Sequence, residues 1–233
     1  PKLDGKLNDD AWAAAAKVPG AVLRGWVTVG PRNNPLRQPR KAWLASDDKH
    51  LYVALRAKVA DTELLAPYEN AARPGDTLRV DFKGAAASAD VEGRNTQIVL
   101  PYILPIRSAA RIGDGEWTCE IAIAWSDAGG RPKPDTAVPF NLAGTDSSLG
   151  KVSWAPVKDF RDIKAFGTLT IVRPDQPDQY ASPTATRRSP QPQAAPRLCL
   201  RGPEPLSFQC VALRRPCRAP PAMAGRAACR RRR

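Results

Sequence analysis

Two apolar runs around a short polar turn, within residues 41–59 (KAWLASDDKHLYVALRAKV), constrain the fold of this chain more than any other stretch. In the second run, apolar residues such as Leu51, Val53 and Leu55 occupy alternate positions, and this period of two is typical of a β-strand. Residues 47–50 form the polar turn, so the stretch predicts a β-hairpin. A hairpin cannot bury its own apolar face, and it therefore needs a second sheet packed against it.

Other short alternating runs accompany the hairpin, separated by turn signals, and no amphipathic pattern of helical length interrupts them. They predict an all-β fold: an antiparallel β-sandwich of about nine strands in a jelly-roll or immunoglobulin-like arrangement. Asn8 or Asp9 carries a capping signal for one or two helical turns, which the ring of Trp12 is expected to pin to the sandwich. Gly25 is expected to be a bulge or crossing point, and residues 84–93 a loop of small residues. The strands expected outside the hairpin are 21–29, 77–82, 95–100, 117–123, 138–142, 152–154 and 167–172.

The composition changes sharply after Val172. Residues 1–172 carry 23 Lys and Arg against 20 Asp and Glu, whereas residues 173–233 carry 13 Arg, no Lys and three acids. Most of the formal net charge of +13 therefore belongs to the last part of the chain. Residues 1–172 suffice for one domain with a single core, while residues 173–233 are too rich in Pro and Arg to bury one, which predicts a disordered tail. The bias toward arginine also suggests the hypothesis that this tail is an out-of-frame translation of GC-rich DNA.

The cysteines and the ends of the chain bear on its partners and compartment. The basic tail could bind nucleic acid or another polyanion by charge alone, and its cysteines lack the paired spacing of a zinc site. Cys119 alternates with apolar neighbours and is expected to be buried. No run reaches the roughly 20 apolar residues that cross a bilayer. The chain begins at Pro1 without a signal peptide, so we expect a processed product that is secreted or periplasmic.

Catalytic chemistry finds little support in the sequence. His50 is the only histidine, and it is expected to be a turn residue, which leaves no plausible nucleophile–base pair. The acidic pairs lie at turn positions, and nothing places two carboxylates around one cleft as a glycosidase requires. Glu120 is expected to be a cross-strand partner rather than an acid catalyst. We therefore expect a protein without enzymatic activity.

Seven segments, in this order, resemble the carbohydrate-binding module family 9 domain, a β-sandwich related to DOMON domains. Each segment is weak alone, but their order and spacing over residues 1–172 indicate the fold strongly. The only methionine is Met223, in the tail, so the haem of some DOMON relatives, which needs axial Met and His, is not expected. The segments are LDGKLNDDAW (3–12), KAWLASDDKHLYVAL (41–55), GDTLRVDF (75–82), EWTCEIAIAW (116–125), FNL (140–142), SWAP (153–156) and AFGTLTI (165–171).

The resemblance implies a slot between two tryptophans that grips the terminal sugar of a glycan, with polar side chains around it and calcium in loops. Here Arg73 stands in place of the first tryptophan and Phe160 in place of the second, and Arg79 replaces an acid on the strand between them. Asp-rich loops could hold a structural calcium ion through oxygen ligands, although no EF-hand spacing occurs. The candidate carbohydrate-binding residues are Asp61, Arg73, Arg79, Gln97, Trp154, Phe160 and Arg161.

These features lead to one expected function and two alternatives. We expect a monomeric, non-catalytic carbohydrate-binding module that recognises glycan ends. It would be accessory to the degradation of xylan- or cellulose-type polysaccharides by glycoside hydrolases, appended to such a hydrolase or to an outer-membrane protein. The first alternative is a structural or protein-interaction sandwich that has lost sugar binding, and the second is polyanion binding through the basic tail.

Overall fold

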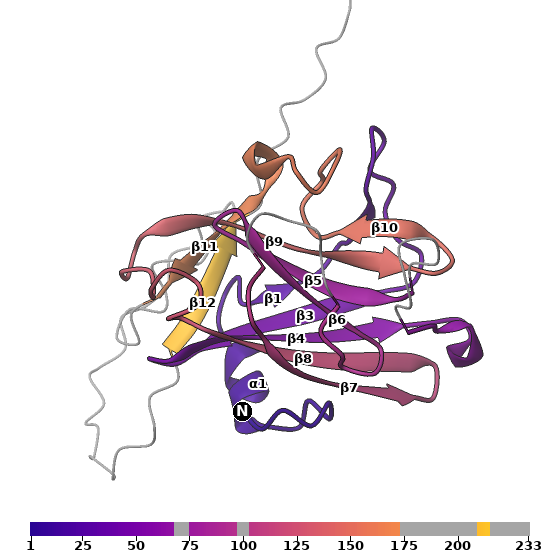
Figure 1. Cartoon of the computed structure of the whole chain (residues 1–233), viewed down its shortest axis with the longest axis horizontal. Coiled ribbons are helices and arrows are strands. Elements are labelled where there is room, and N and C mark those ends of the chain that lie inside the picture. Colours follow the sequence, from indigo (N-terminus) through magenta and orange to yellow (C-terminus); the bar gives the residue numbers. More distant parts are fainter. Residues whose placement is uncertain (68–74, 97–102, 173–208, 215–233) are drawn as a thin grey trace, which may run out of the picture.

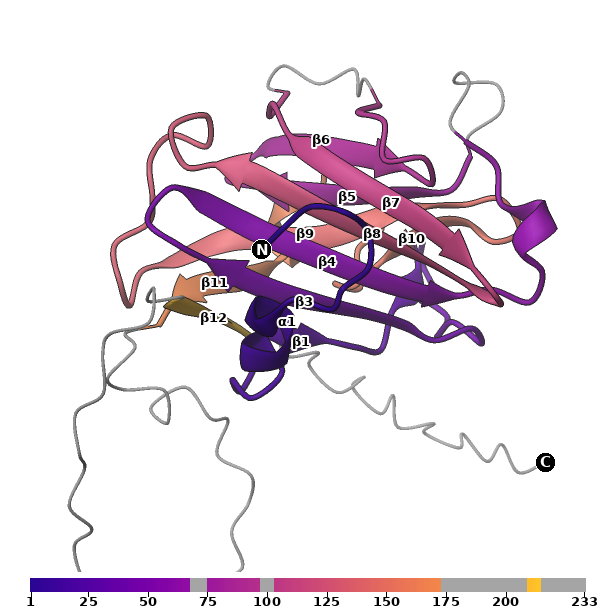
Figure 2. The same cartoon turned by 90° about the horizontal axis from the view of Figure 1, so that it is seen from below.

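The chain folds as an all-β sandwich of two antiparallel sheets (Figures 1 and 2). The computed structural model describes residues 1–67, 75–96 and 103–172, together with the backbone of residues 209–214. The predicted fold class is confirmed, with more strands than the sequence indicates. No helix in these parts of the chain is long and apolar enough to cross a membrane.

The first sheet has the order β12–β3–β4–β8–β7, and the short β1 also pairs with β3. Its centre is the predicted hairpin, whose strands pair from Arg40 with Ala57 to Ser46 with Leu51. The strands are β1 (Val22–Leu23), β3 (Arg40–Ser46), β4 (His50–Lys58), β7 (Arg107–Gly113), β8 (Glu116–Ala124) and β12 (Gln209–Arg214).

The second sheet is built around the long strand β9. One edge of β9 pairs with β5, which in turn pairs with β6, while the other edge is shared by β11 and β10. β2 pairs with β10, and β12 pairs with β11. The strands are β2 (Val27–Thr28), β5 (Thr77–Phe82), β6 (Ala85–Asp90), β9 (Ala137–Asp146), β10 (Gly150–Ser153) and β11 (Gly167–Ile171).

The facing sides of the two sheets form the main core, as their alternation predicts. Leu51, Val53 and Leu55 of β4 are fully buried there against β5, where Val80 is also fully buried. Cys119, on β8, is fully buried in the same core, as predicted, and burial raises the pKa of its thiol.

The outer side of the first sheet is covered by the predicted helix, which is α1 (Asp10–Ala15) (Figure 2). Trp12 packs there against Trp43, Tyr52 and Ala54, so the hairpin is buried on both sides. The expectation that Trp12 pins this helix to the sandwich is confirmed.

Glu120 anchors the N-terminal segment to β8, and it is fully buried. One carboxylate oxygen accepts the backbone N–H groups of Asp4 at 3.0 Å and Gly5 at 2.7 Å. The other accepts the indole N–H of Trp12 at 2.8 Å. Glu120 is therefore a structural acceptor for a distant segment rather than the cross-strand partner that the sequence suggests.

Four features differ from the sequence-based expectation or sharpen it. The segment expected to be a loop at 84–93 contains β6, and β7 was not expected at all. Both are rich in Ala, Ser or Arg, whose weak strand propensity is overridden by pairing with β5 and β8. The chain passes from the first sheet to the second at Gly25, with φ of +71°, which confirms the crossing point. The predicted disordered tail contains one strand, because residues 209–214 form β12 between β11 and β3. The rest of the tail lies outside the described residues.

The hairpin turn is closed by Asp47 rather than by His50. Its carboxylate accepts hydrogen bonds from the N–H groups of Lys49 at 2.8 Å and His50 at 2.7 Å, and from the hydroxyl of Tyr52 at 2.8 Å. Burial alone would raise the pKa of Asp47, but these bonds and the nearby His50 lower it below its usual value. Burial and the bond to Asp47 raise the pKa of Tyr52 to about 12.

Glu120→Ala is expected to lower the free energy of unfolding by about 2–4 kcal/mol, because it leaves three donors without an acceptor in the interior. Urea unfolding measured by fluorescence checks this. Glu116→Ala is the control, since Glu116 forms a partly exposed ion pair with Arg56 at 3.4 Å, a type of pair worth about 0–1 kcal/mol. Equal losses for the two variants would contradict the anchoring role of Glu120.

Asp47→Asn is expected to destabilise the protein at neutral pH and progressively less as the pH falls below about 4. The pKa of Asp47 is lower in the folded chain, so its contribution to stability is present above the unfolded pKa and is lost on acidification. Unfolding curves between about pH 7 and pH 2.5 check this against Asp48→Asn, whose side chain is 83% exposed. A difference between wild type and Asp47→Asn that stays constant with pH would contradict the prediction.

Candidate functional site

The structure brings some of the predicted binding residues together and separates others. Arg79 and Phe160 meet on the outer side of the second sheet, and Arg161 follows Phe160 on the surface. Asp61 lies at a different place, a cavity at one end of the sandwich. Trp154 is 3% exposed within the main core, so its ring is not available as part of a binding rim. Arg73 and Gln97 lie outside the described residues.

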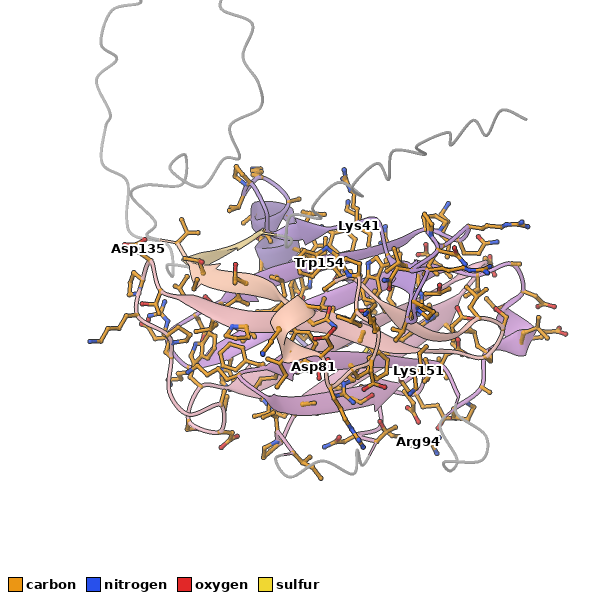
Figure 3. All side chains as sticks on the ribbon, turned by 90° about the horizontal axis from the view of Figure 1, so that it is seen from above. Lys41, Asp81, Arg94, Asp135, Lys151 and Trp154 are labelled. Atoms are coloured by element: carbon orange, nitrogen blue, oxygen red, sulfur yellow. The ribbon has the colours of Figure 1, made fainter. Side chains whose placement is uncertain are left out.

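The outer side of the second sheet is a buried polar layer. Side chains directly opposite each other on paired strands point to the same side, and the register pairs Asp81 of β5 with Asn141 of β9. Ser153 of β10 and Arg79 of β5 both pair with Ala143 of β9, from its two edges. Arg79, Asp81, Asn141 and Ser153 are all less than 9% exposed. The side chains of β5 alternate as predicted. Arg79 and Asp81, however, which were expected to face solvent, are buried (Asp81 is labelled in Figure 3).

Arg79 and Asp81 form an ion pair within this layer. Nε and Nη2 of Arg79 donate to Oδ1 of Asp81 at 2.8 and 2.6 Å. No donor among the described residues reaches the other oxygen of Asp81, Oδ2, which is itself buried. Burial raises the pKa of Asp81, against the lowering effect of the Arg79 charge. The layer thus contains a fixed guanidinium beside a carboxylate oxygen with unused acceptor capacity.

Phe160 lies over this pair, at the edge of the layer. The centre of its ring is 5.0 Å from the guanidinium carbon of Arg79 and 5.4 Å from Nζ of Lys151. Cations at this distance from an aromatic ring attract it by about 0.5–2 kcal/mol, depending on their exposure. Phe160 is half-buried and packs against the main core. The result is an aromatic platform with two cations beside it; we call Arg79, Asp81, Lys151 and Phe160 the Phe160 site.

Asn141 fixes the start of the segment that carries Phe160. It is fully buried, its amide N–H donates to Oγ of Ser153 at 2.9 Å, and its amide oxygen accepts the N–H of Ala155 at 3.0 Å. The segment then runs from β10 to β11, both of which pair with one edge of β9. Asn141 therefore fixes the position, relative to the sheet, of the start of the segment that carries Phe160.

The sequence did not indicate Asp81, Lys151, Asn141 or Ser153 as site residues. For Asp81 a signal existed, because it is two residues from Arg79 on a strand and must share its side of the sheet. Lys151 and Asn141 meet the site only through the register of β9 with its neighbours, and no spacing in the chain reveals that register.

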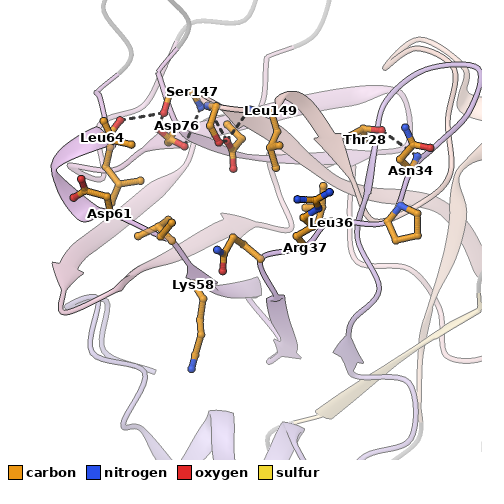
Figure 4. Close-up of a pocket in the computed structure, with 17 residues that line it drawn as sticks. Thr28, Asn34, Leu36, Arg37, Lys58, Asp61, Leu64, Asp76, Ser147 and Leu149 are labelled. Atoms are coloured by element: carbon orange, nitrogen blue, oxygen red, sulfur yellow. Dashed lines mark hydrogen bonds between the residues drawn. The ribbon is translucent and has the colours of Figure 1, made fainter.

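A cavity with a volume of about 580 Å³ opens at the end of the sandwich (Figure 4). This size lies within the range of small-molecule sites. It is bounded by the end of β4, the segment with Asp61, the start of β5 and the β9–β10 turn, and none of the described residues that line it is aromatic. The lining residues are Thr28, Asn34, Pro35, Leu36, Arg37, Gln38, Lys58, Val59, Ala60, Asp61, Leu64, Leu65, Asp76, Asp146, Ser147, Ser148 and Leu149.

The carboxylates of this cavity are already engaged in structural contacts. Asp76 accepts the N–H of Ala66 at 3.3 Å and both the N–H and the hydroxyl of Ser147, at 3.2 and 2.8 Å. Burial raises the pKa of Asp76, although these bonds lower it. Asp146 forms an ion pair with the buried Arg40 at 2.8 Å. Asp61 caps a short 3₁₀ turn by accepting the N–H of Glu63 at 2.9 Å.

No group of three or more His, Cys, Asp or Glu side chains that could hold a metal ion occurs in the described ranges. The structural calcium ion that the resemblance implies therefore stays a prediction.

The fold is similar to solved structures that include two complexes of a carbohydrate-binding module family 9 from Caldicellulosiruptor kristjanssonii. The complex with glucose has a TM-score of 0.52 and 15% identity, over 72% of this chain and 89% of that chain. The complex with cellotriose has a TM-score of 0.49 and 16% identity, over 66% of this chain and 80% of that chain. No protein-family model matches the sequence, and no curated protein matches it significantly. The fold is therefore similar to that of a carbohydrate-binding module, as the sequence predicts.

Asn141→Ala is expected to lower the free energy of unfolding by about 2–3 kcal/mol, because it leaves the N–H of Ala155 and the hydroxyl of Ser153 buried without partners. Urea unfolding measures the loss. Asn34→Ala is the matched control, since Asn34 is exposed and its hydrogen bonds with Thr28 use its backbone N–H and carbonyl. A loss below about 0.5 kcal/mol, the usual effect of a surface substitution, would show that Asn141 does not hold the segment.

Proposed function

We propose that this chain is a non-catalytic carbohydrate-binding module and that its Phe160 site contacts the sugar. The observation that carries the proposal is the half-buried ring of Phe160, held over the Arg79–Asp81 ion pair on one side of the second sheet. The likeness of the fold to a module solved with glucose supports it.

An aromatic ring binds a sugar through the apolar C–H groups on one face of the pyranose. A ring buries about 150–250 Å² in all, and about half of that on the face against a ligand. At about 25 cal/mol per Å², this contact contributes about 2–3 kcal/mol, which is a factor of tens to a hundred in affinity. One aromatic ring is therefore enough for weak binding of a sugar. Binding is expected to be weak because Arg73 stands where the family has the other ring of the slot.

The polar layer supplies partners for sugar hydroxyls. With Nε and Nη2 of Arg79 on Asp81, the third guanidinium nitrogen has no acceptor among the described residues. Oδ2 of Asp81 likewise has no donor there. A hydroxyl group both donates and accepts, so a sugar hydroxyl could accept a hydrogen bond from this guanidinium nitrogen, whereas Oδ2 is buried beneath the surface. Because the ion pair is buried and fixed, little side-chain entropy is lost when a ligand binds.

The wider role follows from this binding. We propose that the module recognises glycan ends and is accessory to the degradation of xylan- or cellulose-type polysaccharides, joined to a glycoside hydrolase or an outer-membrane protein. It would act as a monomer, outside the cell or in the periplasm. Polyanion binding through the basic tail concerns residues outside the described ranges and stays a prediction.

One observation favours a second function, a protein-interaction module. Leu64 and Leu149 are 64% and 44% exposed at the rim of the cavity in Figure 4. Large exposed apolar side chains that lie together often mark interaction surfaces. This function predicts no sugar binding and a protein partner whose crosslinks map to residues 61–65 and 146–149.

Phe160→Ala is expected to weaken binding of cellotriose or xylotriose to the full-length chain by about tenfold to a hundredfold, because it removes the stacking platform. Isothermal titration calorimetry measures the change after a glycan array has identified a bound neutral sugar. Ile163→Ala is the control, since Ile163 is an exposed apolar residue of the same segment, 44% exposed. Equal affinity of wild type and Phe160→Ala would place the binding site elsewhere, and no binding to any glycan would remove the proposed function.

A further inference from the structure

The charges beside Phe160 are not balanced. Arg79 is neutralised by Asp81 at 2.6 Å, but Lys151 has no carboxylate within ion-pair distance among the described residues. Its ammonium nevertheless lies 5.4 Å from the centre of the Phe160 ring. Lys151 is exposed, so this positive charge over the ring is available to a ligand that binds against Phe160.

The neighbouring segment does not cancel this charge. Asp159 and Asp162 flank Arg161, and one oxygen of Asp159 already accepts the N–H of Arg161 at 2.8 Å. Residues 155–166 also carry two lysines, so three basic side chains stand against two acidic ones in this segment. The segment therefore carries no excess of acidic side chains that would neutralise Lys151.

We infer that the Phe160 site prefers an acidic sugar, a pyranose that carries a carboxylate, over its neutral counterpart. This inference rests on the proposed function and names its ligand class. The carboxyl carbon of a uronic acid is attached directly to the sugar ring. When the pyranose binds against Phe160, its carboxylate can accept a hydrogen bond from Nζ of Lys151, which lies near the ring. Lys151 is then the specificity-determining residue, and Phe160 supplies the contact common to both sugars.

The expected preference is modest, because the ion pair forms in contact with water. Exposed pairs change an equilibrium by a factor of about five at most. Salt screens exposed charges over a Debye length of about 10 Å at 0.1 M. The preference should therefore be greatest at low ionic strength and should shrink as salt is added.

Cellobiouronic acid and cellobiose test the inference, since they differ only in the carboxylate of the terminal ring. Calorimetry on the full-length chain, in about 20 mM and about 500 mM NaCl, gives the ratio of the two affinities. Wild type is expected to bind the acid about two to five times more tightly at low salt, with a smaller ratio at high salt. Lys151→Gln is expected to bring the ratio close to one, and Lys151→Glu to reverse it. Lys158→Gln, a nearby exposed lysine without a role in the site, is the control and should leave the ratio unchanged.

Three outcomes would overturn the inference. Equal affinity for the two disaccharides would leave the proposed function standing and remove the acidic preference. A preference that survives in Lys151→Gln would place the recognising cation elsewhere. Failure to bind either disaccharide, together with no binding on a glycan array, would remove the proposed function and the inference with it.

Discussion

The second sheet depends on the pairing of β9, because this strand holds β5 along one edge and both β10 and β11 along the other. Every residue of the Phe160 site is positioned by one of these partners. Arg79 and Asp81 come from β5, Lys151 from β10, and Phe160 from the segment that joins β10 to β11. Since the two ends of that segment are fixed by the same strand, the aromatic ring is held over the sheet rather than free in solution.

The second constraint is the polar layer on the outer side of this sheet. In a simple sandwich the outer side faces water, and polar residues there need no partners. Here Asp81, Asn141 and Ser153 are buried, so each must find hydrogen bonds within the protein or from a ligand. Asn141 and Ser153 satisfy each other. Asp81 retains an oxygen without a donor in the described parts of the chain, so its burial is compensated only through its other oxygen, by the ion pair with Arg79.

Much of the fold is predictable because apolar alternation is a local signal. The hairpin, β5 and β8 appear in the structure as the alternation indicates, and Trp12 covers the hairpin as expected. β6 and β7 are not predicted from the sequence, because Ala, Ser and Arg have a weak strand propensity and these strands depend on pairing with their neighbours. At the site, Arg79 and Phe160 are both candidates that the family resemblance names, and the structure places them together. Lys151 and Asn141 depend on a strand register that only the folded chain reveals. The prediction that Trp154 contributes to a binding rim is wrong, because its side chain, directly after β10, faces the core.

The central claim is that a sugar binds at the Phe160 site rather than at the cavity that contains Asp61. Backbone amide chemical shifts of the full-length chain, recorded while cellotriose or cellobiouronic acid is added, test this most directly. Binding at the Phe160 site predicts saturable shifts in residues 79–81, 151–155 and 159–162, with little change at residues 61–65 and 146–149. Shifts confined to the cavity residues, or no shifts with any glycan, would contradict it.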